Sequence, residues 1–193
     1  KNSVRGRLIP ESGLAVLGGL ESVEQRLRQV KRIHIVACGT AFHAGLVGEY
    51  MLEEYAGIPV EVCIGSEFRY RKAVLDPKDD AVLVISQSGE TADSLAAVRE
   101  AKEKGVLTLG IVNVVGSTIA QETDAGVYTH AGPEIGVAST KVFVSQLAVL
   151  ALFIIFLGRQ RQMSVVVGKR IAEALLAIPK QVQSILEQDS VTK

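Results

Sequence analysis

Five short apolar runs, separated by segments with helical spacing, constrain the fold of this 193-residue chain more than any other feature. Runs of this length, rich in Val and Ile and mostly without polar alternation, are typical of strands that are covered on both faces. The alternation of strand and helix predicts an α/β fold with a doubly wound, five-stranded parallel sheet. The five expected strands are residues 33–37, 60–64, 81–85, 107–112 and 126–130.

Helices are expected in the segments between and after these strands. Residues 42–55 and 91–104 have helical spacing, and Gly105 supplies a natural stop for the second of them. A third helix, over 140–157, is almost wholly apolar. Its longest apolar run has only about half of the ~20 residues that span a bilayer, so we interpret it as a buried core helix.

One further apolar stripe, towards the end of the chain, predicts an amphipathic helix that Pro179 should kink or split. The sequence therefore divides into an N-terminal extension with a helix at 21–30 (residues 1–30), a core (31–160) and a C-terminal helical segment (161–193). The stripe consists of Ile171, Leu175, Ile178, Val182 and Ile185.

Composition narrows the class of protein. With 48% hydrophobic and 22% charged residues, the chain can bury a real core. Lys plus Arg equals Asp plus Glu at 21 each, which argues against nucleic-acid binding. Cys38 and Cys63 have no metal or redox spacing, so we expect both to be reduced, buried thiols. We also expect a cytoplasmic protein that binds no membrane. No motif for a metal or a cofactor is apparent.

Small and hydroxylated residues follow four of the five expected strands, at 38–41, 86–91, 113–118 and 131–140. Ligands of open α/β sheets bind beyond the carboxyl ends of the strands, so these loops are the candidate site. Walker A, the G-x-S-x-G elbow and G-x-G-x-x-G are all absent from them.

The loop 86–91, with the sequence SQSGET, allows two interpretations. Its hydroxyls, its glycine and the helix start behind it could hold a phosphate without any Lys or Arg. Alternatively, Ser88 or Thr91 merely caps that helix. Glu90 counts against an anion site and would have to point away from it.

The histidines and one aromatic-basic stretch are less informative. His34 and His130 lie in or at the end of expected strands, where a packed or hydrogen-bonded role is expected. His43 follows the first loop, where capping or a surface role is favoured over ligand contact. Residues 67–72 interleave aromatics with cations, which favours a salt-bridged helix start or a subunit contact over nucleic-acid stacking.

Four motifs carry a resemblance to a known family: CGT at 38–40, SEFRYR at 66–71, SQSGETAD at 86–93 and EIGVASTK at 134–141. Together they resemble the sugar isomerase (SIS) domain, and more narrowly the first of two SIS modules in the glutamine:fructose-6-phosphate aminotransferase family. The likeness covers the chain from about residue 2 to residue 190.

The resemblance implies a flavodoxin-like strand order and a set of substrate-binding residues. In relatives a serine often follows the CGT motif where this chain has Ala41, so one hydroxyl contact is expected to be absent. The residues implied to hold the sugar phosphate are Ser86, Gln87, Ser88 and Thr91, and those implied to line the sugar are Gly39, Thr40, Val137 and Ser139.

The resemblance also implies a hexose phosphate ligand (fructose 6-phosphate or glucosamine 6-phosphate), no cofactor and a homodimer. The family's catalytic groups lie in a glutaminase domain and a second SIS module, to which residues 161–193 would lead. We therefore expect this chain to bind the sugar phosphate without converting it. Two alternatives stay open: a sugar-phosphate-sensing module of a regulator, and a stand-alone phosphosugar isomerase with Glu134 or His43 as its base.

Overall fold

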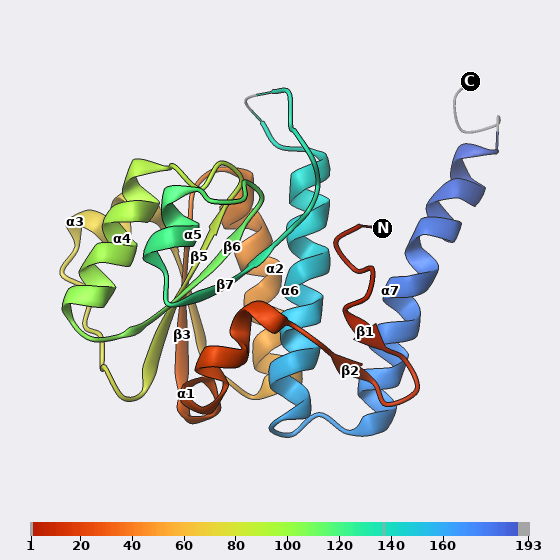
Figure 1. The fold of residues 1–193 in the computed structure, drawn as a ribbon, viewed down its shortest axis with the longest axis horizontal. Coiled ribbons are helices and arrows are strands. Elements are labelled where there is room, and N and C mark those ends of the chain that lie inside the picture. Colours follow the sequence, from red (N-terminus) through yellow and green to blue (C-terminus); the bar gives the residue numbers. More distant parts are fainter. Residues whose placement is uncertain (1, 137, 189–193) are drawn as a thin grey trace.

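All five predicted strands form, and they pair in parallel in a single sheet. The computed structural model describes residues 2–136 and 138–188, and Figure 1 shows the sheet with helices on both of its sides. The order β4-β3-β5-β6-β7 is the flavodoxin-like order, so the predicted fold class is confirmed. The strands are β3 (Arg32–Ala37), β4 (Val60–Ile64), β5 (Asp80–Ser86), β6 (Leu107–Val112) and β7 (Ala125–Tyr128).

The fifth strand ends two residues earlier than the sequence predicts. Thr129 still donates its backbone N–H to the carbonyl of Val112, at 2.9 Å, but His130 has a φ of 51°. That left-handed backbone conformation cannot continue a strand, so the chain turns away from the sheet at this point.

One group of helices packs on one face of the sheet and a second group packs on the other. The first group is α2 (Thr40–Ala56) and α6 (Lys141–Arg159), which pack on strand residues such as Ile35 and Leu83. The second group is α3 (Gly65–Tyr70), α4 (Ala92–Glu103) and α5 (Thr118–Glu122), which pack on residues such as Val84. Because side chains alternate along a strand, each strand contributes to both cores.

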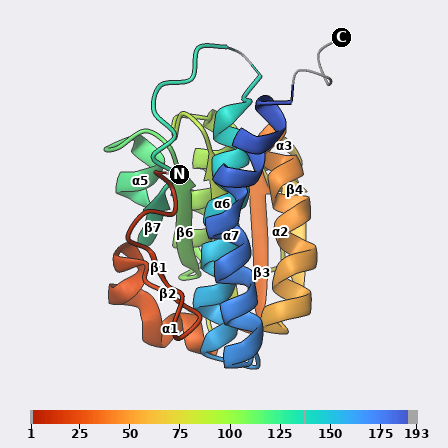
Figure 2. The same cartoon turned by 90° about the vertical axis from the view of Figure 1, so that its right-hand side faces the viewer.

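Among the described residues, α6 is the one helix long and apolar enough to cross a membrane. Its Leu150, Phe153 and Ile154 are buried in the core that also contains the sheet, and Figure 2 shows α6 running beside α7 along the molecule. A Cβ on Gly48 of α2 would lie 3.1 Å from a methyl group of Leu150, so the two helices approach closely at this glycine. We interpret α6 as the predicted core helix.

The N-terminal segment is more structured than the sequence indicates. An antiparallel pair, β1 (Leu8–Ile9) with β2 (Leu14–Ala15), precedes a 3-10 turn (Gly18–Val23) and α1 (Glu24–Gln29), where the sequence predicts one helix at 21–30. Two-residue strands are too short to show a periodic pattern. Leu20 and Leu27 are buried in the core shared with α2 and α6, so this segment is part of the same hydrophobic unit.

The C-terminal helix α7 runs without interruption from Val165 to Leu186, so the predicted split at Pro179 is wrong. Proline removes one backbone donor, which leaves the carbonyl of Leu175 without its usual helical partner. Pro179 and its neighbour Lys180 are exposed, so water can satisfy that carbonyl and the helix continues.

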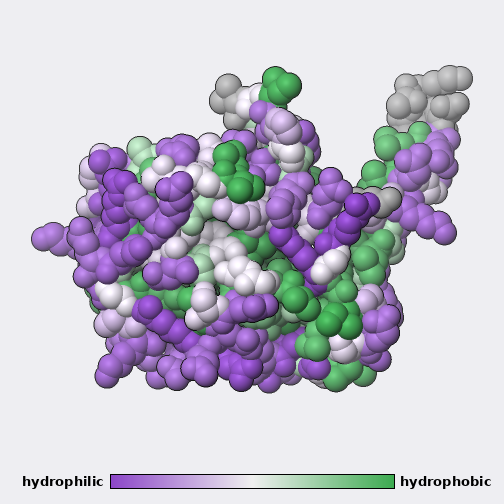
Figure 3. Space-filling model, viewed as in Figure 1, coloured by the Kyte–Doolittle hydropathy of each residue, from purple (hydrophilic) through white to green (hydrophobic). Residues whose placement is uncertain are grey.

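The outer half of α7 leans away from α6 in Figure 1. A groove of about 1060 Å³, lined mainly by apolar side chains, lies between the N-terminal residues, α2, α6 and α7. Figure 3 shows apolar side chains gathering on this side of the molecule, around β2 and α7. Leu176, Ile178, Val182 and Ile185 are among the exposed apolar residues of α7.

Candidate functional site

The loops after β3 and β5 leave the sheet at its topological switch point. The chain passes from β3 through α2 to β4 on one side, and from β5 through α4 to β6 on the other. Ala37 pairs with Ile85, so the loops that begin at Cys38 and Ser86 start side by side on adjacent strands. Ligands of open α/β sheets bind in this crevice, which places the predicted site at the expected edge.

The loop 86–91 forms a tight turn around Gly89, whose φ is +68°. The N–H of Gly89 donates to Ser86 Oγ at 3.0 Å, and the N–H of Glu90 donates to Ser88 Oγ at 3.1 Å. Ser86 Oγ also lies 3.3 Å from Thr91 Oγ1. Because Ser88 uses its oxygen as an acceptor, its hydroxyl proton is left for another partner.

Helix α4 begins directly behind this turn and has no side-chain cap. Thr91 is its N-cap residue, yet neither its hydroxyl nor any other side chain accepts a hydrogen bond in the capping position. The capping interpretation of SQSGET is therefore not what the structure shows. The N–H groups of the first turn and the positive end of the helix dipole are left available to an anion.

Glu90 points away from this turn, as an anion site requires. Its Oε1 accepts the N–H of Thr118 at 2.7 Å, and its Oε2 accepts the hydroxyl of Thr118 at 2.7 Å. These hydrogen bonds, the backbone one foremost, hold the pKa of Glu90 below its usual value. The carboxylate therefore stays ionised at the start of α5 and faces a partner there.

The neighbouring loop presents a second uncapped helix start. Gly39 is the N-cap residue of α2, with φ +58° and ψ −134°, and Thr40 opens the helix. A side chain at position 39 would be strained by this backbone conformation although nothing lies within 4 Å of its Cβ. Ala41 is buried in the core, so its methyl group contributes to the packing of α2.

The third part of the predicted site lies on the segment that joins β7 to α6. Val137 lies outside the described residues, and Ser139 is half-buried. Figure 1 shows the segment rising above the start of α6, beyond the sheet edge. No hydrogen bond among the described residues joins Ser139 to the loop 86–91. The structure thus brings Gly39, Thr40 and residues 86–91 together at the ends of the adjacent strands β3 and β5, but does not add Ser139 to them.

Glu134, a candidate base in the sequence, is occupied as an acceptor. Its carboxylate accepts hydrogen bonds from Val142 N at 2.9 Å, Thr140 N at 3.2 Å and Thr140 Oγ1 at 3.2 Å. The bond from Val142 is the main reason why the pKa of Glu134 lies below its usual value. A carboxylate stabilised in its ionised form at a helix start is a weak proton acceptor.

The second candidate base, His43, is exposed on the first turn of α2, where its ring packs edge-on against Phe42 at 5.6 Å between centroids. Among the described residues, no hydrogen bond or ion pair orients its ring for proton transfer. Its position is that of a surface residue.

Asn113 belongs to one of the candidate loops, but the sequence reasoning gave it no role. It follows β6, and its Oδ1 accepts the hydroxyl of Thr129 at 2.8 Å and the N–H of Ala131 at 2.9 Å. Its Nδ2 donates to the carbonyl of Gly132 at 2.9 Å. Asn113 therefore fixes the start of the segment that carries Ser139. An amide at the end of a strand, on the edge where the candidate loops gather, is the signal that could have identified it.

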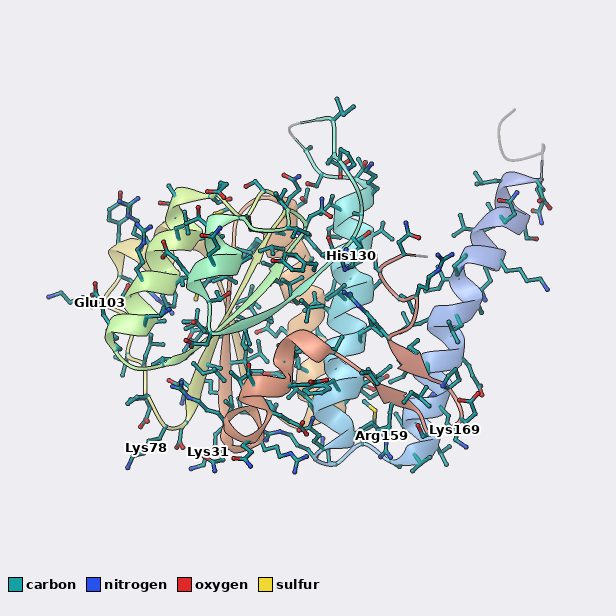
Figure 4. The ribbon with its side chains drawn as sticks, in the orientation of Figure 1. Lys31, Lys78, Glu103, His130, Arg159 and Lys169 are labelled. Carbon is teal, nitrogen blue, oxygen red and sulfur yellow. The ribbon has the colours of Figure 1, made fainter. Side chains whose placement is uncertain are left out.

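The other titratable residues singled out in the sequence lie away from the site. His34 is buried in the sheet, with Nε2 3.4 Å from Asp80 Oδ2, which confirms the packed role predicted for it. His130, labelled in Figure 4, is exposed and only tilts against Tyr128, so the packed position predicted for it is wrong. The left-handed backbone at this residue carries its side chain out of the sheet.

The stretch 67–72 forms the predicted salt bridges, but it covers the end of α3 rather than a helix start. Arg69 on α3 pairs with Asp93 of α4 at 3.1 Å, and Arg71 pairs with Glu61 of β4. Cys63, beside this group, is buried as predicted, and burial raises the pKa of its thiol to about 11. Cys38 at the candidate site is only half-buried, which differs from the prediction.

Three cavities lie outside the turn 86–91 and the loop after β3. They are the apolar groove, one of about 470 Å³ on α4 that includes Ala92, and one of about 900 Å³. The last is basic and lies at the opposite edge of the sheet, where Figure 4 labels Lys31 and Lys78. Within the described residues, 2–136 and 138–188, no cluster of His, Cys, Asp or Glu is suited to a metal ion.

This strand order, with ligand-accessible loops at its switch point, defines the class of flavodoxin-like, doubly wound α/β domains. The family model for the SIS domain matches residues 26–156, and the chain belongs to the SIS domain family.

Individual proteins of known name are similar to this chain over most of its length. It is 53% identical, over all 193 residues, to glutamine–fructose-6-phosphate aminotransferase [isomerizing] of Chlorobaculum tepidum, and spans 31% of that protein. It is 46% identical to the Clostridium tetani protein of the same name, with 92% of this chain and 29% of that protein covered.

A solved structure, the C-terminal domain of glucosamine-fructose-6-phosphate aminotransferase from Francisella tularensis, superposes with a TM-score of 0.89. Its sequence is 36% identical, and the match covers 98% of this chain and 52% of that one. The chain therefore corresponds to about half of that solved domain and under a third of the full-length relatives.

Proposed function

We propose that this chain is the fructose-6-phosphate-binding half of the isomerase domain of a glutamine–fructose-6-phosphate aminotransferase. The names of its relatives and its share of their length support this assignment over a regulatory sugar-phosphate sensor or a stand-alone isomerase. The occupied carboxylate of Glu134 also counts against a base supplied within this chain. The cytoplasmic location and the homodimeric state stay predictions.

One observation carries the proposal: an uncapped helix start behind a hydroxyl-rich turn at the switch point of the sheet. Several donors at this turn are left for an external acceptor, and an anion would suit all of them. They are the first-turn N–H groups of α4, the hydroxyl proton of Ser88 and one hydroxyl proton of the Ser86–Thr91 pair. A phosphate monoester has enough oxygen atoms to accept from all of them. Gln87, which follows β5 directly, is half-buried beside this turn.

The role that we propose for this half is to position the substrate. A phosphate held at the turn 86–91 would fix one end of the open-chain sugar and direct its C1 and C2 towards reacting groups elsewhere in the enzyme. Holding reactants in register can lower a barrier by up to about 7–11 kcal/mol in favourable systems. The loop after β3, with Gly39 and Thr40, starts beside the turn and would contact the sugar portion.

Isothermal titration of the chain with fructose 6-phosphate, and with fructose as the phosphate-free control, tests this proposal. We expect binding of the phosphate ester only. Ser88→Ala and Thr91→Val should each weaken it about tenfold, because a hydrogen bond to a charged group contributes roughly 1.5–3 kcal/mol. Ser22→Ala, an exposed serine in the N-terminal segment, is the matched control and should bind as the unmodified chain does.

Two results would contradict the proposal. The first is equal affinity for fructose and fructose 6-phosphate, since the phosphate would then contribute nothing. The second is formation of glucosamine 6-phosphate by this chain alone from fructose 6-phosphate and ammonia, since the chain would then be a complete catalyst rather than a binding half.

A further inference from the structure

Glu90 is an unexpected neighbour for a phosphate site. It is exposed, directly precedes the N-cap residue Thr91, and carries a negative charge beside the proposed anion. An exposed carboxylate that is free to rotate would repel a phosphate at the same turn. The structure shows instead that Glu90 is held by the neighbouring helix.

Both carboxylate oxygens of Glu90 are bound by Thr118, the first residue of α5. The backbone N–H of Thr118 reaches Oε1 at 2.7 Å, and its hydroxyl reaches Oε2 at 2.7 Å. This two-point contact fixes the side chain more firmly than a single hydrogen bond would. It also satisfies a helix-start N–H group that would otherwise lack an intrahelical partner.

The backbone of the turn makes a parallel contact with the same helix start. The carbonyl of Gly89 accepts the N–H of Ile119 at 3.0 Å. A Cβ on Gly89 would lie 2.0 Å from Ser117 Oγ, so the turn and the residue before α5 are in very close contact. Two consecutive residues of the turn therefore bind two consecutive N–H groups of α5.

The far end of α5 is held by α4, the helix behind the turn. Glu122 at the end of α5 forms a two-point ion pair with Arg99 of α4, at 2.6 and 2.9 Å, and its carbonyl accepts from Lys102 at 2.6 Å. The turn 86–91 is thus clamped between two helices that are bound to each other at their opposite ends.

We propose that Glu90 is a positioning residue for the anion site: by binding the start of α5 it holds the turn 86–91 in the shape that presents its hydroxyls and the N–H groups of α4. The same contact directs the charge of Glu90 away from the anion. This inference rests on the proposed function, because it names what shapes the proposed phosphate site. The role differs from ligand contact, since Glu90 acts through Thr118 and Gly89.

The test measures the dissociation constant for fructose 6-phosphate in four variants of the chain. Glu90→Ala removes both contacts, Glu90→Gln keeps one carbonyl acceptor, and Thr118→Val keeps only the backbone donor. Glu100→Ala removes an acid of α4 whose partner is Lys104, at 2.8 Å and away from the turn, and is the matched control. Thermal unfolding of each variant establishes that it folds.

We expect Glu90→Ala to weaken binding about tenfold or more, because hydrogen bonds to an ionised group are strong. Glu90→Gln should recover part of that loss of affinity. The dissociation constant of Thr118→Val should lie between those of Glu90→Ala and Glu90→Gln, and Glu100→Ala should leave binding unchanged. Hydrogen exchange of the Thr118 and Ile119 amides should speed up in Glu90→Ala and not in Glu100→Ala. If Glu90→Ala fails to fold, the Glu90→Gln and Thr118→Val results decide.

The inference is overturned if Glu90→Ala and Glu90→Gln bind fructose 6-phosphate as tightly as the unmodified chain or more tightly. Tighter binding would mean that the charge repels the ligand and that the contact with Thr118 contributes nothing. In that case the proposed function still stands, because the unmodified chain binds. If the unmodified chain binds no fructose 6-phosphate, both the function and the inference are wrong.

Discussion

Gly89→Ala is the substitution whose effect on the candidate site can be worked out most fully from the structure. Gly89 has a φ of +68°, a conformation that costs an alanine about 1–2 kcal/mol. The new Cβ would also lie 2.0 Å from Ser117 Oγ and 2.5 Å from Ser117 Cβ. Because the second distance involves Cβ, rotating the serine side chain cannot relieve the contact, and the backbone has to move.

Gly116→Ala separates the two costs. Gly116 has a φ of +74°, but nothing lies within 4 Å of its Cβ position, so the substitution should cost only the conformational part, about 1–2 kcal/mol. Overpacking a filled site costs roughly a further 1–3 kcal/mol. We therefore expect Gly89→Ala to lower the free energy of unfolding by about 2–5 kcal/mol, which in a protein of this size lowers Tm by several degrees.

Urea unfolding followed by far-ultraviolet circular dichroism measures both variants. Ser117→Gly removes both clashing atoms, so in the Gly89→Ala background it should restore the overpacking part and leave a loss close to that of Gly116→Ala. Equal losses in Gly89→Ala and Gly116→Ala would refute the reasoning, because the contact with Ser117 would then have no energetic consequence. Failure of Ser117→Gly to rescue would refute it as well.

Three further predictions follow from the geometry. The thiol of Cys63, whose pKa is raised to about 11, should resist alkylation at pH 8 while half-buried Cys38 reacts, as mass spectrometry of the labelled chain would show; equal labelling would contradict this. Leu150→Ala should lower the free energy of unfolding in urea by about 2–5 kcal/mol, since Leu150 is fully buried between α6 and α2; a loss under 1 kcal/mol would mean that the two helices are loosely packed. Because the hydrogen bonds from Val142 and Thr140 lower the folded-state pKa of Glu134, its contribution to stability is present above its unfolded pKa and is lost as the pH falls through the folded value. The stability difference between the unmodified chain and Glu134→Gln should therefore shrink in urea titrations below about pH 4, and a constant difference would contradict the hydrogen bonds.

The sheet was predictable because its signals are local and strong. Strands buried on both faces appear as apolar runs, and the helices between them carry their own spacing and a stop such as Gly105, whose φ is +72°. The short elements were not predictable: β1, β2 and α5 are too brief to show a period and form because tertiary contacts hold them. The interruption expected at Pro179 did not occur, because an exposed helix tolerates one missing hydrogen bond.

The candidate site was predictable only in part. The residue types in SQSGET identify the loop, together with the rule that ligands of open α/β sheets bind beyond the carboxyl ends of the strands. The choice between a capped helix start and an anion site depends on the hydrogen bonds that each hydroxyl makes. The partner of Glu90 lies 28 residues along the chain, at Thr118, and the role of Asn113 depends on Thr129 after the next strand. Contacts between loops of different strands leave no pattern in a single sequence.

The most direct test of the central claim follows the backbone amides of the chain by NMR during titration with fructose 6-phosphate and, separately, with fructose. The account predicts that amides of the turn 86–91 and of the first turn of α4 shift with the phosphate ester and stay unchanged with fructose. Shifts confined to the basic cavity around Lys31 and Lys78, or no response at 86–91, would contradict the claim that this turn holds the phosphate.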